Sequence, residues 1–218
     1  GVDGYHGNYV HSSFIRIAAR AGEGKASAFT AVRESGGAIG LAHGDGLIER
    51  PYGGMAGQYD YADRRHASYH EDLAAAYGPE RLPDILAQRN VLIFPNLFLF
   101  ESHIRVIQPV TVSQTIVTML PTLLDGVPDV MNTARLRSHE RFFGPAGFGT
   151  PDDVEMFVNC ENGMRGRAVQ WVRLDRGLHR ERGQNDVLTG HSTDETPQRS
   201  AYRRWRAIMQ DAPSGPQA

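Results

Sequence analysis

Short apolar runs in the middle of the chain predict a set of neighbouring strands. Residues 36–49 place apolar side chains among glycines on either side of a His-Gly-Asp-Gly segment, and glycine with aspartate marks a turn between two strands. Four more apolar or Val- and Thr-rich runs follow, at 90–94, 97–100, 103–109 and 112–120. Such residues suit a pleated sheet, and because the connections are short we expect neighbouring strands to pair antiparallel.

Segments with helical periodicity flank these strands on both sides. We expect helices at 3–20, at 67–88 with a break at Gly78, at 128–143, from Thr150 onward and at 196–210. Thr150 is the expected N-cap of the fourth helix, with Pro151 in its first turn. The expected buried stripe of the last helix is Ala201, Tyr202, Trp205, Ile208 and Met209.

The segments before the last helix carry weaker patterns. Residues 165–182 are charged and loosely strand-like, and residues 184–195 read as a polar loop. The arginines of the last helix are expected on a solvated or subunit-facing surface, namely Arg199, Arg203, Arg204 and Arg206. Helices on either side of an antiparallel block predict an α+β fold.

Composition limits the class of protein. The chain has 218 residues of which 40% are hydrophobic, which suits one domain with a sizeable core. The formal net charge of −2 gives no indication of a nucleic-acid partner, and no apolar run is long enough for a membrane span. The single cysteine, Cys160, excludes a disulfide framework within the chain and fits a cytoplasmic protein.

The first eleven residues hold the strongest candidate chemistry, a carboxylate and two imidazoles at Asp3, His6 and His11. Asp3 and His6 are three residues apart, so on a helix the Asp3 carboxylate could accept the second ring N–H of His6. His6 and His11 are five apart, which places them about 140° apart on a regular helix. They can meet on one metal only if the backbone is distorted, and we expect that distortion at 7–9.

A second candidate segment, Gly144 to Asp153, ends in two carboxylates, Asp152 and Asp153. Asp153 falls on one predicted helix face with Met156, Phe157 and Cys160, and a carboxylate in an apolar face needs a partner. Two histidines and one carboxylate form the ligand set of non-haem Fe(II) oxygenases. The plainer interpretation stays open, because most of the nine histidines are expected to be structural and acids are common in a first helical turn.

Three motifs together resemble one family. D-G-Y-H-G-N-Y-V-H, from Asp3 to His11, resembles the D-x-Y-H-x4-H segment of the large (alpha) subunits of Rieske-type aromatic-ring-hydroxylating oxygenases. G-P-A-G-F-G-T-P-D-D resembles the segment that carries the third iron ligand. G-H-S-T-D-E-T-P-Q-R-S-A-Y-R-R-W, near the C-terminus, is similar to the signature of benzoate- and phenylpropionate-type members. The resemblance runs over essentially the whole chain.

The resemblance implies a fold and a set of metal ligands. It implies a mononuclear-iron catalytic domain over residues 1–218, with a curved antiparallel sheet flanked by helices (Bet v 1-like, or helix-grip). His6, His11 and Asp153 match the Fe(II) ligands, and Asp3 matches the acid that bridges the iron to a Rieske cluster in a neighbouring subunit. Apolar candidates for the substrate pocket are Val10, Phe14, Phe98, Phe100 and Phe148.

The resemblance also implies a reaction and partners. We expect cis-dihydroxylation or hydroxylation of an aromatic substrate with O2, electrons from a ferredoxin or reductase, and an α3 or α3β3 trimer. One feature departs from the family: the family's [2Fe–2S] Rieske cluster needs two Cys and two His, and this chain has one cysteine and no C-x-H. The chain is therefore expected to be a catalytic domain cut from a longer protein, or one that has lost its Rieske domain.

Two other functions stay open at this point. A zinc hydrolase could use the same three ligands plus a water molecule. A non-catalytic carrier of hydrophobic ligands could have the same helix-and-sheet fold. Recognition of a substrate carboxylate is undecided, although Arg16 and Arg105 are available for it.

Overall fold

An antiparallel sheet lies at the centre of the computed structural model, which describes residues 1–20, 36–50, 67–184 and 186–211. Within these ranges the sheet has eight strands in the order β6-β5-β4-β3-β2-β1-β8-β7, and all neighbours are antiparallel. The strands are β1 (Gly37–Leu41), β2 (Gly46–Arg50), β3 (Gln88–Ile93), β4 (Leu97–Leu99), β5 (His103–Thr111), β6 (Gln114–Pro121), β7 (Arg182–Gln184) and β8 (Val187–His191).

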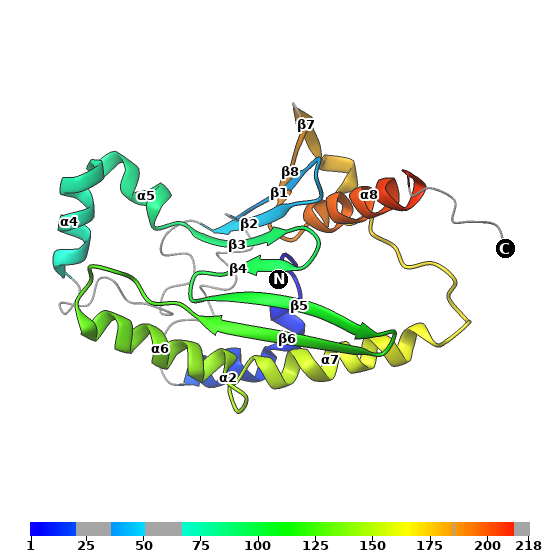
Figure 1. Ribbon diagram of the computed structural model, residues 1–218, viewed down its shortest axis with the longest axis horizontal. Helices are drawn as coiled ribbons and strands as arrows, with labels where there is room; N and C mark the ends of the chain where they lie inside the picture. The colour runs from blue at the N-terminus through cyan, green and yellow to red at the C-terminus, as the bar shows by residue number, and fades with distance from the viewer. Residues whose placement is uncertain (21–35, 51–66, 185, 212–218) are drawn as a thin grey trace.

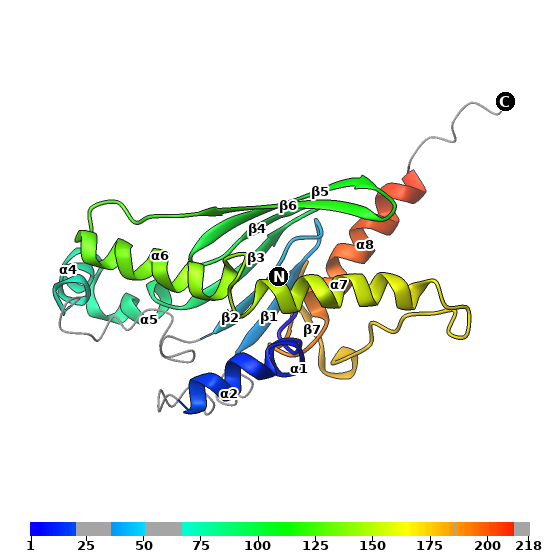
Figure 2. The same ribbon diagram turned by 90° about the horizontal axis from the view of Figure 1, so that it is seen from below.

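The helices surround this sheet (Figure 1). They are α1 (Gly7–Val10), α2 (Ser12–Arg20), α4 (Ala67–Tyr77), α5 (Leu82–Ile85), α6 (Asp129–Phe143), α7 (Thr150–Met164) and α8 (Thr196–Asp211), with single 3-10 turns at Pro79–Arg81 and Leu178–Arg180. Figures 1 and 2 show α6 and α7 following one another along the side of β5 and β6. α1 packs against α7, whereas α8 packs against β1 and β2. None of the helices in the described ranges is both long and apolar enough to cross a membrane.

The α+β prediction is confirmed, and so is most of the strand order. The turn after Leu41 joins β1 to β2, and β2 to β6 follow one another as neighbours in the sheet. The predicted break at Gly78 separates α4 from α5, and the last helix begins at Thr196 as expected. These features depend on local turn residues and short connections, which is why the sequence predicts them.

The prediction for residues 184–195 was wrong. They contain β8, which pairs with β1 from Gly37–His191 to Leu41–Val187. The strand is only five residues long, so its own pattern is weak and pairing with β1 stabilises it. Of the predicted strand-like segment at 165–182, only the last residue lies in a strand, the three-residue β7.

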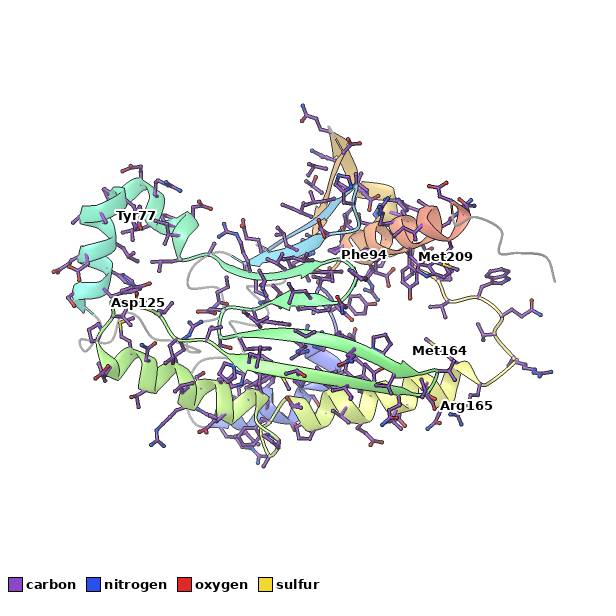
Figure 3. All side chains as sticks on the ribbon, viewed as in Figure 1. Tyr77, Phe94, Asp125, Met164, Arg165 and Met209 are labelled. Atoms are coloured by element: carbon purple, nitrogen blue, oxygen red, sulfur yellow. The ribbon has the colours of Figure 1, made fainter. Side chains whose placement is uncertain are left out.

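The predicted buried face of α8 was also wrong. Tyr202, Trp205 and Met209 are more than half exposed, and Ala201 alone of the expected stripe packs against the central core. Figure 3 shows Met209 in the later turns of the helix. The buried residues lie in the first turns, at Thr196, Pro197, Arg199 and Ser200. α8 therefore meets the sheet through its N-terminal end.

Arg199 was expected on the surface but is 7% exposed. Its Nε donates to Glu181 Oε2 at 2.9 Å, and Glu181 is equally buried. Burial raises the pKa of Glu181, but the bonds from Arg199 and Arg203 outweigh burial and leave that pKa below its usual range. The pair fixes the chain before β7 to the first turns of α8.

The chain start is part of the core. Val2, Ile48 and Leu92 form a buried cluster, and Phe98 and Ala201 pack against it. Val2 thereby connects the first residues to β2 and β3 on one side and to α8 on the other. This anchoring holds the segment that follows Val2, which includes Asp3, His6 and His11.

Candidate metal centre

The three predicted ligands converge. His6 directly precedes α1, His11 lies between α1 and α2, and Asp153 is in the first turn of α7. Their ligand atoms all lie within 4.8 Å of one another. His11 Nε2 is 3.3 Å from Asp153 Oδ1, and His6 Nε2 is 3.8 Å from the same oxygen. Two imidazole nitrogens therefore face one carboxylate, which lies 142 residues after His11 in the sequence.

A break in the helix brings the two histidines to the same side. α1 ends after Val10, and His11 has φ −97° and ψ 30°, outside helical geometry. The predicted distortion is present, but its predicted place was wrong because residues 7–10 are helical. Gly7 is the first residue of α1, whereas the large cost of glycine applies in a helix interior.

Asp3 organises the turn that carries His6. Its Oδ1 accepts the backbone N–H of Tyr5 at 2.9 Å and that of His6 at 3.1 Å. The Asp3 backbone carbonyl oxygen lies 2.7 Å from His6 Nδ1, whereas the carboxylate is 3.9 Å away. The main-chain carbonyl, and not the carboxylate as predicted, is therefore the partner of that ring nitrogen. With its proton on Nδ1, His6 presents the Nε2 lone pair toward Asp153.

The charges of the site suit a divalent cation. Burial lowers the pKa of His6 and favours the neutral imidazole, which is the form that binds metals. Burial raises the pKa of Asp153, but its hydrogen bond with His11 and its electrostatic interaction with His11 and His6 outweigh burial, so that this pKa falls below its usual range. Neutral imidazoles with one carboxylate are a donor set that fits Fe(II) or Zn²⁺.

The neighbouring carboxylate, Asp152, lies behind His11. Its Oδ2 is 3.7 Å from His11 Nδ1 and 3.5 Å from the hydroxyl of Ser13. His11 is 4% exposed, and its Nδ1 makes no hydrogen bond to any residue that the structure describes. Histidines that bind metals usually direct the second ring nitrogen at an acceptor, and Asp152 is placed for it. The sequence signal for this residue was its position directly before Asp153.

The remainder of α7 differs from its prediction. Gly149, and not Thr150, is the N-cap, while the Thr150 hydroxyl donates to the Phe143 carbonyl at 3.0 Å. Phe157 is 64% exposed and Cys160 is also exposed, so the face that follows Asp153 is not buried within the described ranges. Asp153 is half-buried because it lies at the end of α7 that contacts α1.

Tyr5, Glu195 and Arg176 form a polar clamp, which joins the segment that carries the histidines to residues near the C-terminal end of the chain. Tyr5 donates its hydroxyl to Glu195 Oε1 at 2.9 Å, and Glu195 Oε2 accepts the backbone N–H of Arg176 at 2.9 Å. The Arg176 guanidinium lies 4.3 Å from the centre of the Tyr5 ring. At Gly4, an added Cβ would lie 1.9 Å from the Ser192 carbonyl oxygen. Sequence reasoning found neither Glu195 nor Arg176, because nothing local relates them to Tyr5.

Glu195→Ala should lower the free energy of unfolding by about 3–6 kcal/mol. The change leaves the Tyr5 hydroxyl and the Arg176 N–H without their acceptor, and hydrogen bonds to charged groups contribute about 1.5–3 kcal/mol each. Urea denaturation of the purified variant measures the loss. Glu80→Ala, at an exposed glutamate, is the matched control and should change stability by less than about 0.5 kcal/mol. An unchanged unfolding midpoint for Glu195→Ala would show that the clamp does not stabilise the fold.

The predicted pocket residues separate into two groups. Phe14 lies 5.1 Å from Phe142 and 5.9 Å from Phe148 between ring centres, and Phe142 lies 5.1 Å from the His11 ring. These rings form an aromatic wall beside the candidate ligands. Val10 is half-buried at the end of α1.

The other two predicted residues lie in β4 and directly after it. Phe98 is partly buried and packs against the Val2 core. Phe100 stacks on His103 with 4.5 Å between ring centres and 8° between planes. Sequence reasoning missed His103. It named Arg105 without placing it, and the structure puts the Arg105 guanidinium 4.8 Å from the centre of the Phe100 ring.

Comparison with known proteins identifies relatives of this chain by sequence. No protein-family model matches the chain. The large subunit of 2-halobenzoate 1,2-dioxygenase from Burkholderia cepacia is 32% identical over 187 residues, which cover 81% of this chain and 39% of the relative. The large subunit of anthranilate 1,2-dioxygenase from Acinetobacter baylyi is 29% identical over 56% of this chain and 29% of the relative. The chain thus spans well under half the length of these relatives.

Solved structures share the fold. A mutant of naphthalene 1,2-dioxygenase bound to phenanthrene superposes with a TM-score of 0.76 at 21% identity, over 96% of this chain and 50% of that one. Naphthalene 1,2-dioxygenase from Rhodococcus sp. bound to indole gives a TM-score of 0.72 at 19% identity, over 96% and 51%. At these identities the likeness establishes the fold.

Proposed function

Because the chain is related by sequence to the large subunits of aromatic-ring-hydroxylating dioxygenases, we propose that residues 1–218 are the catalytic domain of such a subunit, acting on an aromatic substrate with O2. The single observation that carries the proposal is the convergence of His6, His11 and Asp153, whose ligand atoms lie within 4.8 Å of one another. The fold shared with naphthalene 1,2-dioxygenase supports it.

The three residues would hold a mononuclear Fe(II) through both Nε2 atoms and the Asp153 carboxylate. Three protein ligands leave positions open for other molecules. Iron bound there would provide the place where O2 is reduced, and O2 that has not been reduced does not attack an aromatic ring. The Asp3 carbonyl keeps a proton on His6 Nδ1, and the wall of Phe14, Phe142 and Phe148 keeps water from that side of the site.

The electrons would come from outside the domain. We assign Asp3 to the junction with a neighbouring subunit, whose Rieske [2Fe–2S] cluster supplies electrons that originate from a ferredoxin or reductase. This arrangement requires a ring of subunits, so an α3 or α3β3 trimer is part of the proposal. The product would be a cis-dihydrodiol or a hydroxylated ring.

The two other functions are less well supported. A zinc hydrolase fits the three ligands equally well, but the sequence relatives are named dioxygenases. A carrier of hydrophobic ligands fits the fold, but it gives no reason for two imidazole nitrogens and a carboxylate to converge within the half-buried site.

Metal analysis and oxygen uptake test the proposal on the full-length protein that contains this domain. We expect iron in the mononuclear site and oxygen uptake that depends on an aromatic substrate, with benzoate, 2-halobenzoate, anthranilate and toluate as the first compounds. Both atoms of ¹⁸O₂ should appear in a dihydrodiol product. Stoichiometric zinc without oxygen uptake would support the hydrolase, and tight substrate binding without any metal would support the carrier.

A further inference from the structure

Three buried polar side chains near the aromatic wall each have one nitrogen without a hydrogen-bond partner among the described residues. Arg105 is 9% exposed, His103 is fully buried and His139 is 7% exposed. Arg105 Nε, His103 Nε2 and His139 Nδ1 have no hydrogen-bond partner within the described ranges. The three residues come from β5 and α6, two elements that are distant in sequence.

Ring contacts join these side chains into one cluster. The imidazoles of His103 and His139 lie 5.0 Å apart between ring centres. The Arg105 guanidinium lies 4.8 Å from the centre of the Phe100 ring and 5.8 Å from that of Phe143. Both phenylalanine rings also contact His103, each at 4.5 Å. The guanidinium therefore shares its aromatic surroundings with both imidazoles.

The cluster carries one positive charge. Burial, followed by the charge of Arg105, lowers the pKa of His103 to about 3 and also lowers that of His139, so both imidazoles are neutral near pH 7. Burial also lowers the pKa of Arg105, but a guanidinium stays protonated in proteins. Its Nη2 donates to the Met119 sulfur at 3.6 Å, a weak acceptor. A buried charge with such partners is costly unless a ligand pairs with it.

Another buried arginine shows how the fold satisfies a guanidinium that has a structural role. Arg135 is 5% exposed, and its Nε donates to the Thr122 carbonyl at 2.7 Å. Its Nη2 donates to the Thr122 hydroxyl at 2.9 Å and to the Glu101 carbonyl. Arg105 has no comparable set of oxygen acceptors among the described residues.

Asp153 is the carboxylate whose charge acts on Arg105. In the proposed function this carboxylate is a metal ligand, so its charge would be shared with the cation. Arg105 would then keep a positive charge close to the metal site with no acid committed to it. An anionic group on the substrate would supply the missing partner.

We propose that Arg105 binds the carboxylate of an aromatic acid, and that His103 and His139 donate hydrogen bonds to the same group. The inference rests on the proposed function and adds to it the substrate class and the residue that selects it. Ser102 Oγ lies 3.2 Å from His103 Nδ1. If that hydroxyl donates, the proton of His103 is on Nε2, where it can be donated to the carboxylate. The substrate ring would then extend from Arg105 toward Asp153.

Equilibrium binding to a protein that cannot turn over tests the proposal. The full-length protein is loaded with zinc, which takes the same ligands and has no redox chemistry, and benzoate and benzamide are titrated by calorimetry. The two compounds have the same shape, and only benzoate is charged. A hydrogen bond to a charged group contributes about 1.5–3 kcal/mol, so the wild type should bind benzoate about 10–100-fold more tightly than benzamide.

Arg105→Met should weaken benzoate binding by about 10–100-fold and benzamide binding by less than about threefold. Arg105→Lys keeps the charge but loses the planar guanidinium, so its affinity for benzoate should lie between those of the wild type and Arg105→Met. The matched control is Arg135→Met, which removes a buried arginine with oxygen acceptors. It should lower the thermal unfolding temperature and leave the benzoate-to-benzamide ratio unchanged.

Three results would overturn the proposal. The wild type could bind benzoate no more tightly than benzamide, or Arg105→Met could keep the wild-type preference for benzoate. In the third, Arg105→Met binds benzoate and benzamide more weakly by the same factor. Retained preference in Arg105→Met would mean that benzoate binds the metal directly. Arg105→Gln replaces Arg105→Met if the latter does not fold. Arg105-dependent benzoate binding without oxygen uptake in the iron form would reject the proposed function and retain the anion site.

Discussion

Replacing His6 with alanine should prevent iron from binding and stop turnover. His6 supplies one of three ligand groups, and loss of a residue that merely supports a ligand already costs about 10–100-fold in metal affinity or activity. Loss of a ligand itself should therefore cost more than about 100-fold. The His6 ring makes its hydrogen bond to the backbone of Asp3, three residues away, so the fold should survive. Metal content and substrate-dependent oxygen uptake of the purified full-length variant measure both effects.

The matched control is His179→Ala, since His179 is exposed on the 3-10 turn before β7. This variant should keep both iron and activity. A His6→Ala protein with a full complement of iron at the mononuclear site would show that the convergence of His6, His11 and Asp153 is not the metal site. Turnover by such a protein would refute the proposed function of these residues as well.

Asp3→Asn should separate metal binding from electron delivery. Asparagine keeps an Oδ1 that can accept the backbone N–H groups of Tyr5 and His6, as the carboxylate does at 2.9 and 3.1 Å. The Asp3 carbonyl that orients His6 is also unchanged. Iron content should therefore remain near that of the wild type, while the loss of the charge at the subunit junction lowers turnover by about 10–100-fold.

Iron analysis, steady-state oxygen uptake and the rate of electron transfer in a single turnover distinguish these effects. Asp129→Asn, at an exposed acid in the first turn of α6, should leave all three measurements unchanged. If Asp3→Asn loses iron and activity in equal proportion, Asp3 acts only through the position of His6. Asp3 would then have no bridging role, and the proposal that His6, His11 and Asp153 bind the metal would be unaffected.

Sequence alone determined the features that depend on neighbouring residues. The turn between β1 and β2 and the break at Gly78 follow from glycine, aspartate and proline within a few positions. The candidate ligands were also found from sequence, because His6 and His11 lie in one short motif and Asp153 lies in another. That the motifs would meet followed from the family resemblance, and the structure places them together.

Tertiary structure alone decided which polar side chains are buried and what they contact. β8 is a strand because its backbone pairs with β1. Arg199 is buried because α8 contacts the sheet through its first turns. Glu195 reaches Tyr5 across 190 residues, and His103 of β5 meets His139 of α6 because α6 lies along the side of β5 and β6. Hydrophobic periodicity indicates where apolar side chains go, but it cannot indicate which charged groups share their interior, since that depends on contacts between distant segments.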